Sequence, residues 1–283
     1  MVDVRLIIDP PQSGPWNMAV DEVLLMDAVE NGVATLRFYQ WSEPTLSLGY
    51  FQHYADREQH AASRDCIVVR RQTGGGAILH DRELTYSFAL PGNIPLARQA
   101  ADLYATVHNN FIAALAANQP AATATSTLRI RGDQPSPVTD SPSAEPFLCF
   151  QRRSPGDVIL LQPSQTDTKS PTIASDPGTG WKVLGSAQRR HRGAILQHGS
   201  LLIDASPAAP ELPGLQNLSG PNLSLDRLIA AVCPELSKAL ELKLIPSQLS
   251  QELQSQRPNW RTISMDRRFG QIVVKPSGRA TDL

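Results

Sequence analysis

The stretch most informative about the fold is IVVRRQTGGGA, residues 67–77. Its apolar run, Ile67 to Val69, predicts a strand, and three consecutive glycines follow it. Each glycine would weaken a strand, because it sacrifices packing and backbone entropy. Glycines suit a loop whose backbone amides approach a phosphate or carboxylate, and Arg70 and Arg71 add positive charge there. A plain hairpin turn fits the spacing equally well, because neither GxxxxGK[ST] nor GxGxxG is complete.

Further strands are predicted on both sides of this loop. They cover residues 4–9, 35–41, 46–50, 67–71, 84–90, 157–161, 181–188 and 194–203. Helices are predicted over residues 16–31, 97–117 and 225–242. Because strands dominate and the helices are few and separate, the pattern predicts an α+β fold with a mixed sheet flanked by helices. Residues 133–146 and 162–180, rich in proline, serine, threonine and aspartate, are predicted to be exposed loop insertions.

The composition is that of a soluble globular protein. The chain has 283 residues, of which 41% are hydrophobic and 19% charged. The formal net charge of −1 argues against broad binding to nucleic acid or to an anionic membrane. No apolar run reaches the roughly 20 residues that span a bilayer, and no secretion signal is evident at the start. Three cysteines without a CxxC pair fit a reducing compartment, so a cytoplasmic location is expected.

Two residues stand out as candidates for chemistry. Cys149 lies between Leu148 and Phe150, where a cysteine is usually a small buried hydrophobe. It also lies at the end of a proline-rich loop, a setting that favours a nucleophile, and both interpretations stay open. Lys182 interrupts a strand that otherwise looks buried, so it either faces solvent or meets a polar group. A lysine beside a thiol would favour the thiolate and could hold an acyl carbonyl oxygen.

Other polar clusters have weaker signals. His80-Asp81 fits either a turn or a catalytic base, and the six histidines show no metal-binding spacing, so no metal site is predicted. The run Arg189-Arg190-His191-Arg192-Gly193 predicts the tip of a hairpin. It would be either a solvated turn or a docking patch for an acidic partner.

The order of the motifs along the chain is more specific than any one of them. The series is NMAVDE (17–22), RRQTGGGAILHD (70–81), ELTYS (83–87), CF (149–150), KVLGSAQ (182–188) and QHGSLL (197–202). It resembles the lipoate–protein ligase and octanoyltransferase family, which is related to biotin–protein ligases. The resemblance implies a fold of the biotin and class II aminoacyl-tRNA synthetase type, with an acyl tunnel under the glycine loop. It assigns residues 1–245 to the catalytic domain and 246–283 to a short C-terminal segment without a separate domain.

Two chemistries share this scaffold, and the Cys-Phe pair ahead of the lysine strand resembles the cysteine-dependent octanoyltransferases. That resemblance implies transfer of an octanoyl or lipoyl group from acyl carrier protein, through a Cys149 thioester, without a cofactor. The acceptor would be a lysine of a lipoyl domain of 2-oxoacid dehydrogenases or of glycine-cleavage H protein. The first alternative is a lipoate–protein ligase that needs ATP and Mg²⁺ and acts through lipoyl-AMP. The second is a non-catalytic protein that binds an acyl group or its carrier.

The resemblance also assigns roles to individual residues. Cys149 and Lys182 would be catalytic, with Lys182 on the acyl carbonyl. At one position the chain departs from the pattern of the octanoyltransferases, which often carry arginine where this chain has Gly76. Three consecutive glycines are closer to the pattern of the ligases. The substrate-binding residues would be Arg71, Thr73, Gly74, Gly75, Gly76, Ala77, His80, Gly185, Ser186, Ala187, His198 and Gly199.

Overall fold

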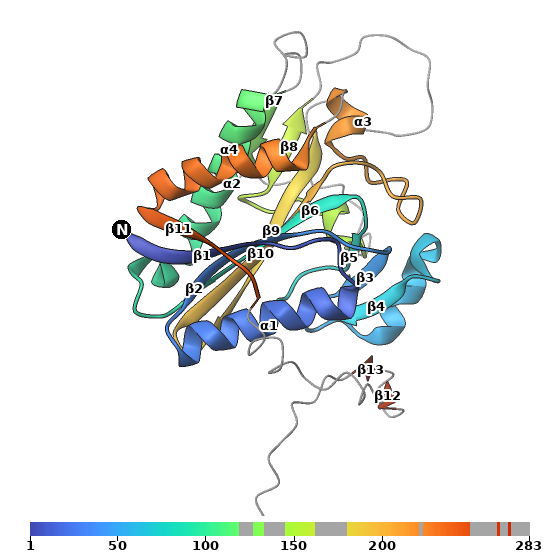
Figure 1. The fold of residues 1–283 in the computed structure, drawn as a ribbon. Coiled ribbons are helices and arrows are strands. Elements are labelled where there is room, and N and C mark those ends of the chain that lie inside the picture. Colours follow the sequence, from blue (N-terminus) through green and yellow to red (C-terminus); the bar gives the residue numbers. More distant parts are fainter. Residues whose placement is uncertain are drawn as a thin grey trace, which may run out of the picture.

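A computed structural model describes residues 1–118, 127–132, 145–161, 180–220 and 223–249, and the backbone of the strand pair β12 (Met265–Asp266) and β13 (Gln271–Ile272). Its main element is an eight-stranded sheet in the order β11-β1-β2-β6-β10-β9-β8-β7 (Figure 1). β1 is parallel to both of its neighbours, and every pair from β2 outward to β7 is antiparallel. The strands are β1 (Val2–Ile8), β2 (Ala34–Tyr39), β6 (Glu83–Leu90), β7 (Thr127–Ile130), β8 (Val158–Leu161), β9 (Trp181–His191), β10 (Ala194–Leu202) and β11 (Leu242–Ser247).

A smaller sheet carries the glycine loop. It has the order β4-β3-β5, formed by β4 (Ile67–Arg70), β3 (Thr45–Leu48) and β5 (Ile78–His80). The glycines connect β4 to β5, so both ends of the loop are fixed by strands that pair with β3. Two short 3-10 helices, η1 (Tyr54–Gln59) and η2 (Ala61–Ser63), join β3 to β4.

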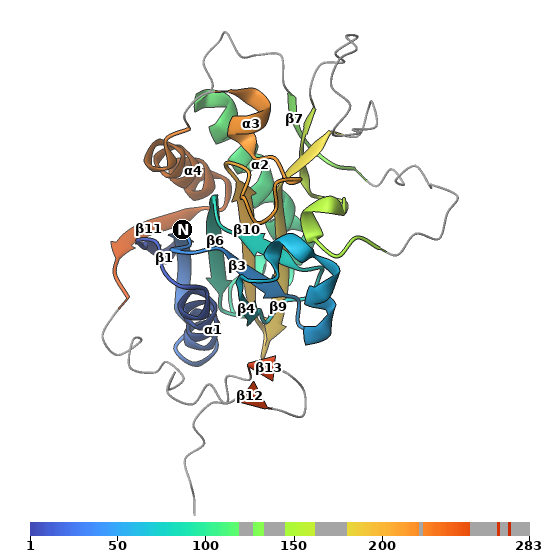
Figure 2. The same ribbon diagram turned by 90° about the vertical axis from the view of Figure 1, so that its right-hand side faces the viewer.

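The helices cover both sides of the main sheet. They are α1 (Gly14–Glu30), α2 (Ala100–Asn118), the short α3 (Leu215–Ser219) and α4 (Leu225–Ala239). Figure 1 shows α2 and α4 on one side of the sheet and α1 on the other, and Figure 2 shows the small sheet in front of β10 and β9.

Side-chain alternation along the strands explains this layering. In β2, Leu36 and Phe38 join the large apolar cluster under α2 and α4. The intervening Arg37 and Tyr39 point to the opposite face, because successive strand residues alternate. Arg37 is wholly buried there and pairs with Asp21 of α1. The sheet therefore has an apolar face toward α2 and α4 and a polar face toward α1 and the small sheet.

All of the predicted strands and helices are present, and the predicted mixed α+β class is confirmed. Each of the predicted strands and helices matches an observed element within a few residues, whereas β5, β7, β11, β12, β13 and the short helix α3 were not predicted. The helix predicted to reach residue 242 was wrong at its end. Glu241 has a left-handed backbone (φ 52°), and Leu242 then pairs with Val2 of β1. The helix cannot continue through that turn, because an isolated left-handed residue breaks its hydrogen bonding.

Three further expectations concern the domain boundary, the two loop insertions and the location of the protein. The predicted boundary of the catalytic domain, at residue 245, falls inside β11. The predicted loops 133–146 and 162–180 lie almost entirely outside the described residues. None of the helices described is long and apolar enough to cross a bilayer, and the cytoplasmic location stays a prediction.

Candidate active site

The glycine loop holds the segment that carries Cys149. Ala77, the residue after the glycines, donates its amide to the Phe147 carbonyl at 3.0 Å. The Cys149 amide in turn donates to the Ala77 carbonyl at 2.7 Å. Cys149 then begins η5 (Cys149–Gln151), one turn of 3-10 helix. The thiol is therefore fixed to the end of the small sheet by two backbone hydrogen bonds.

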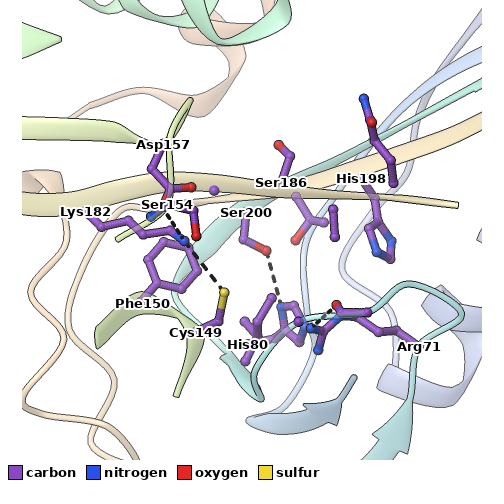
Figure 3. Close-up of a pocket in the computed structure, with 18 of the residues that line it drawn as sticks. Arg71, His80, Cys149, Phe150, Ser154, Asp157, Lys182, Ser186, His198 and Ser200 are labelled. Carbon is purple, nitrogen blue, oxygen red and sulfur yellow. Dashed lines mark hydrogen bonds and ion pairs between the residues drawn. The ribbon is translucent and has the colours of Figure 1, made fainter. Parts of the chain in front are cut away.

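Lys182 enters the same space from β9. Its side chain is 3% exposed, and its Nζ lies 3.6 Å from the Cys149 Sγ (Figure 3). Nζ also lies 2.9 Å from Asp157 Oδ2 and 5.2 Å from the centre of the Phe150 ring. Of the two settings that the sequence left open for this lysine, the structure has the buried one, facing polar partners.

Asp157 is a site residue that was not predicted from the sequence, and it holds Lys182. Its carboxylate is 2% exposed and accepts hydrogen bonds from the Ser154 amide at 2.7 Å and from the Tyr104 hydroxyl at 3.1 Å. These two donors and Lys182 fix its orientation. Burial, together with the nearby Asp157 charge, raises the pKa of Tyr104, so its hydroxyl stays protonated and donates. A signal was available, because a buried lysine needs a carboxylate and Asp157 directly precedes an apolar strand.

Arg71 organises the glycine loop from inside. Its guanidinium donates to the carbonyls of Gly74 and Gly76, both at 2.7 Å, and to the Ser47 carbonyl at 3.0 Å. Burial lowers the pKa of Arg71 to about 10, against the opposing influence of the charge at Cys149, so the group is cationic at neutral pH. Arg71 thus braces the loop carbonyls and places a second positive charge near the thiol.

The loop amides remain available. Within the described residues, the amides of Gly74, Gly75 and Gly76 donate to no other group of the chain. Their carbonyls, by contrast, are held by Arg71 at two of the three positions. The arrangement fits the prediction that this loop presents backbone donors to a ligand.

A directed chain of hydrogen bonds anchors the start of the loop. Arg71 Nε donates to Thr73 Oγ1 at 3.2 Å, so the Thr73 hydroxyl is free to donate to His198 Nε2 at 2.6 Å. His198 Nδ1 then donates to Asp21 Oδ2 at 3.0 Å. Despite the raising effect of burial, hydrogen bonds from His198 and the charge of Arg37 hold the pKa of Asp21 below its usual value. Thr73 therefore acts through His198 as an anchor of the loop.

His80 is held at both ring nitrogens. Nε2 lies 2.7 Å from Ser47 Oγ and Nδ1 lies 2.7 Å from Glu83 Oε1. The ring stacks on Trp41 with centroids 3.9 Å apart. These contacts make His80 a fixed part of the cavity wall.

These residues surround a cavity of about 270 Å³, near the lower end of the range for small-ligand sites. Eleven of the fourteen predicted site residues line it, namely Cys149, Lys182 and nine others, whereas Thr73, Gly76 and Ala77 do not. The nine are Arg71, Gly74, Gly75, His80, Gly185, Ser186, Ala187, His198 and Gly199. Lining residues that were not predicted include Met18, Tyr39, Thr85, Tyr104, Phe150, Ser154, Asp157 and Ser200.

At two of the lining glycines, a neighbouring side chain lies so close to the backbone that a larger residue would not fit. A Cβ on Gly185 would lie 2.4 Å from Lys182 Cε, and one on Gly199 would lie 2.1 Å from Ser186 Oγ. Real Cβ atoms do not approach other atoms so closely. Gly185 and Gly199 therefore make room for the lysine and the serine.

Ser186 belongs to a buried polar network under the cavity. Its hydroxyl lies 2.7 Å from the Tyr86 hydroxyl and 2.6 Å from His108 Nε2, while His108 Nδ1 donates to the Gly156 carbonyl at 2.8 Å. Burial lowers the pKa of His108 to about 4, so the ring is neutral at pH 7. Nδ1 must carry the proton to donate, so Nε2 accepts from Ser186.

The other cysteines have different surroundings. Burial raises the pKa of the Cys233 thiol to about 11 and also raises that of Cys66. Neither lines the cavity. In the part of the chain that is described, no three metal-ligating side chains converge on one point.

Comparison with known proteins addresses the predicted family. Residues 13–211 match the lipoyl protein ligase A/B catalytic domain. The chain belongs to this family. Membership confirms the predicted resemblance and the prediction that the chain is an enzyme of protein lipoylation.

The similar relatives include several proteins named octanoyltransferase LipM. The one from Kyrpidia tusciae is 31% identical over 274 residues, covering 88% of this chain and 91% of the relative. The one from Brevibacillus brevis is 30% identical with the same coverage. The one from Carboxydothermus hydrogenoformans is 37% identical over 196 residues, covering 68% of this chain and 61% of the relative.

Solved structures of lipoate ligases share the fold. Lipoate-protein ligase A bound with ATP superposes with a TM-score of 0.61 at 17% identity, covering 90% of this chain and 92% of that one. A bi-partite lipoate protein ligase from Thermoplasma acidophilum, described with its E2 lipoyl domain, gives a TM-score of 0.60 at 17% identity and 90% coverage of both chains. At these identities the similarity concerns the fold alone.

Proposed function

We propose that this member of the lipoyl ligase family is an octanoyltransferase. It takes an octanoyl group from acyl carrier protein and passes it to a lysine of a lipoyl domain or of glycine-cleavage H protein, through a thioester on Cys149. The observation that carries the proposal is the approach of Lys182 to Cys149, at 3.6 Å, in the wall of the cavity. The names of the relatives support octanoyl transfer.

The first half-reaction forms the acyl-enzyme. The Cys149 thiolate attacks the carbonyl carbon of the octanoyl thioester, the bond from that carbon to the carrier's sulfur breaks, and the carrier leaves as a thiol. Lys182 supplies the proton to the departing sulfur and stabilises the negative charge that develops on the carbonyl oxygen. Asp157 keeps the Lys182 ammonium directed at this point, since the two lie 2.9 Å apart.

The second half-reaction transfers the acyl group to the acceptor. The neutral ε-amine of the acceptor lysine attacks the thioester carbon, an amide bond forms, and Cys149 leaves as a thiolate. The attacking amine must lose a proton. Lys182, which is neutral after donating in the first step, accepts it and returns to the ammonium form. The cycle therefore balances without an additional base.

The transferase reaction uses no cofactor in this proposal, because the octanoyl group arrives already activated as a thioester. The ligase alternative requires ATP and Mg²⁺ to make lipoyl-AMP. The free amides of Gly74, Gly75 and Gly76 favour that alternative, since such amides suit phosphate. A ligase, however, does not need a thiol 3.6 Å from its lysine, and this contact supports the transferase. A non-catalytic binder has no use for that contact either.

Intact-protein mass spectrometry tests the proposal directly. The protein is mixed with octanoyl–acyl carrier protein in the absence of ATP. We expect a hydroxylamine-sensitive octanoyl adduct on Cys149, absent from Cys149→Ser, and loss of transfer by at least about 10³-fold in that variant. The control is Cys66→Ser, at a cysteine that does not line the cavity, and this variant should keep the adduct. Acceptor lipoylation that requires ATP and proceeds with Cys149→Ser would establish the ligase instead, and saturable carrier binding without any product would indicate a binder.

A further inference from the structure

An exposed aromatic pair borders the cavity. Tyr50 and Phe51 follow β3 and are 46% and 83% exposed. The Tyr50 amide donates to the Thr73 carbonyl at 2.9 Å. The Phe51 ring lies 3.9 Å from the place that a Cβ on Gly74 would take. Because Gly74 lines the cavity, the two aromatic rings stand at its rim.

The exposure of this pair is built into the turn. Arg70 Nη1 donates to the carbonyls of Gly49, Tyr50 and Gln52 at 2.8, 3.1 and 2.6 Å. The Gly49 amide donates to the Gln52 side chain at 2.9 Å. A fixed backbone that presents large apolar side chains to water is a mark of an interaction site.

One arginine of β9 contacts the aromatic pair, and three further arginines lie on or against the same β9–β10 hairpin. The Arg189 guanidinium lies 5.0 Å from the centre of the Tyr50 ring. In the sequence, Arg189 directly follows Gln188, which lines the cavity. Arg190 donates to the carbonyl of Arg98, which ends η3 (Pro95–Arg98), at 2.9 Å, and Arg192 forms the hairpin tip. Among the described residues, no carboxylate lies within ion-pair distance of these four arginines. We call Tyr50, Phe51, Arg98, Arg189, Arg190 and Arg192 the rim patch.

We propose that the rim patch docks the acidic carrier domain that delivers the acyl group, an inference that rests on the proposed octanoyl transfer. The chain as a whole carries a net charge of −1. The positive charge of these unpaired arginines is therefore local to this surface and does not reflect an excess of basic residues over the whole chain. Such a cluster attracts an acidic surface and speeds its productive encounter. The adjacent aromatic rings supply the apolar contact that arginines alone lack.

The position of the rim patch favours the donor over the acceptor. The patch adjoins the loop at Gly74, whereas Cys149 is bound to Ala77 at the other end of the loop. Figure 3 likewise shows Cys149 and Lys182 at one end of the cavity and His198 at the other. An acceptor lysine is short, so its domain must sit directly over Cys149. A carrier presents its thioester on a long pantetheine arm, which reaches the thiol from a domain held at the rim.

The test compares two donors for the first half-reaction. The rate of octanoyl adduct formation is measured with octanoyl–acyl carrier protein and with octanoyl-pantetheine, which has the arm but no protein. The variants are Arg190→Glu/Arg192→Glu and, separately, Phe51→Ser. The matched control is Arg227→Glu/Lys238→Glu, which makes the same change of net charge with two exposed cations of α4.

We expect the arginine variant to lose at least about tenfold in rate with the carrier while its rate with octanoyl-pantetheine stays within twofold of wild type. Added salt should slow the wild type with the carrier and leave the variant unchanged. Phe51→Ser should show the same donor-specific loss. An unchanged rate with the carrier overturns the docking proposal, and so does a loss confined to transfer onto the acceptor. If neither donor acylates the wild type, the proposed function itself has failed.

Discussion

The Nζ of Lys182 lies 3.6 Å from the sulfur of Cys149, although 33 residues separate them in the chain. β9 supplies the lysine, and the segment paired with the glycine loop supplies the thiol. The two therefore meet only when the small sheet packs against the main one. The glycine loop thus has two functions in this fold, since it walls the cavity and fixes the nucleophile opposite the lysine.

The Lys182–Asp157 pair gives the first prediction, on stability and rate together. Both side chains are almost fully buried, so Asp157→Asn leaves a buried ammonium without its counter-charge. We expect the free energy of unfolding to fall by about 3 kcal/mol or more, the usual cost of breaking a buried pair. Acylation of Cys149 should slow by at least about 10²-fold, because the lysine loses its orientation. Chemical denaturation and adduct formation measure the two effects.

A double variant separates charge from packing at this pair. Lys182→Met/Asp157→Asn removes both charges, so it should recover much of the lost stability while acylation stays abolished. The exposed pair Lys243–Asp3, with side chains 62% and 65% exposed, provides the control, and Asp3→Asn should change neither quantity measurably. A double variant no more stable than Asp157→Asn would contradict this account of the pair.

The second prediction concerns the shape of Arg71. The planar guanidinium donates to the carbonyls of Gly74, Gly76 and Ser47 at the same time, and the single amine of a lysine cannot match that geometry. Arg71→Lys should therefore lower the free energy of unfolding by about 2 kcal/mol, because buried carbonyls lose their donors. Acylation should also slow, since the loop also holds Cys149. Arg64→Lys, at an exposed arginine, should leave the thermal midpoint and the acylation rate unchanged.

The third prediction compares Gly49, which lies against the Gly75 carbonyl, with Gly74, which has room for a Cβ. A Cβ on Gly49 would lie 2.1 Å from the Gly75 carbonyl oxygen, and backbone cannot move away as a side chain can. A Cβ on Gly74 would meet only the Phe51 ring, at an ordinary 3.9 Å. Gly49→Ala should cost about 2–3 kcal/mol of unfolding free energy, and Gly74→Ala less than about 0.5. Equal stability of the two variants would show that the loop does not press against β3.

The sequence predicted the main elements of this fold because they follow local rules. Apolar runs such as Ile67–Val69 mark strands, and the order of the motifs identified the family. β11 was missed because its partner is β1, at the opposite end of the described chain, and no local pattern announces such a pairing. For the site, Cys149 and Lys182 were predicted, but Asp157, the carboxylate that pairs with Lys182, was not. The contact of Lys182 with Asp157 depends on how β9 and the segment before β8 come together, which spacing does not encode.

The fourth prediction is a dependence of stability on pH through His108. The structure lowers its pKa from 6.5 to about 4 because the ring is buried, so the folded chain resists taking up the proton. Between pH 6.5 and about 4 the unfolded chain binds a proton that the folded chain does not. The free energy of unfolding must therefore fall as the pH is lowered through this window, by up to about 3 kcal/mol from this group.

His108→Gln tests the assignment, because glutamine keeps an oxygen acceptor for the Ser186 hydroxyl and does not titrate. The variant should be less stable than wild type at pH 7 by about 1–2 kcal/mol, since it loses the hydrogen bond to Gly156. The stability difference should shrink as the pH falls from 6.5 to about 4, because only the wild type loses the contribution of a neutral ring. His191→Gln, at the hairpin tip, is the control and should follow the wild-type profile. Parallel pH profiles for wild type and His108→Gln would show that the buried imidazole is not the group that titrates.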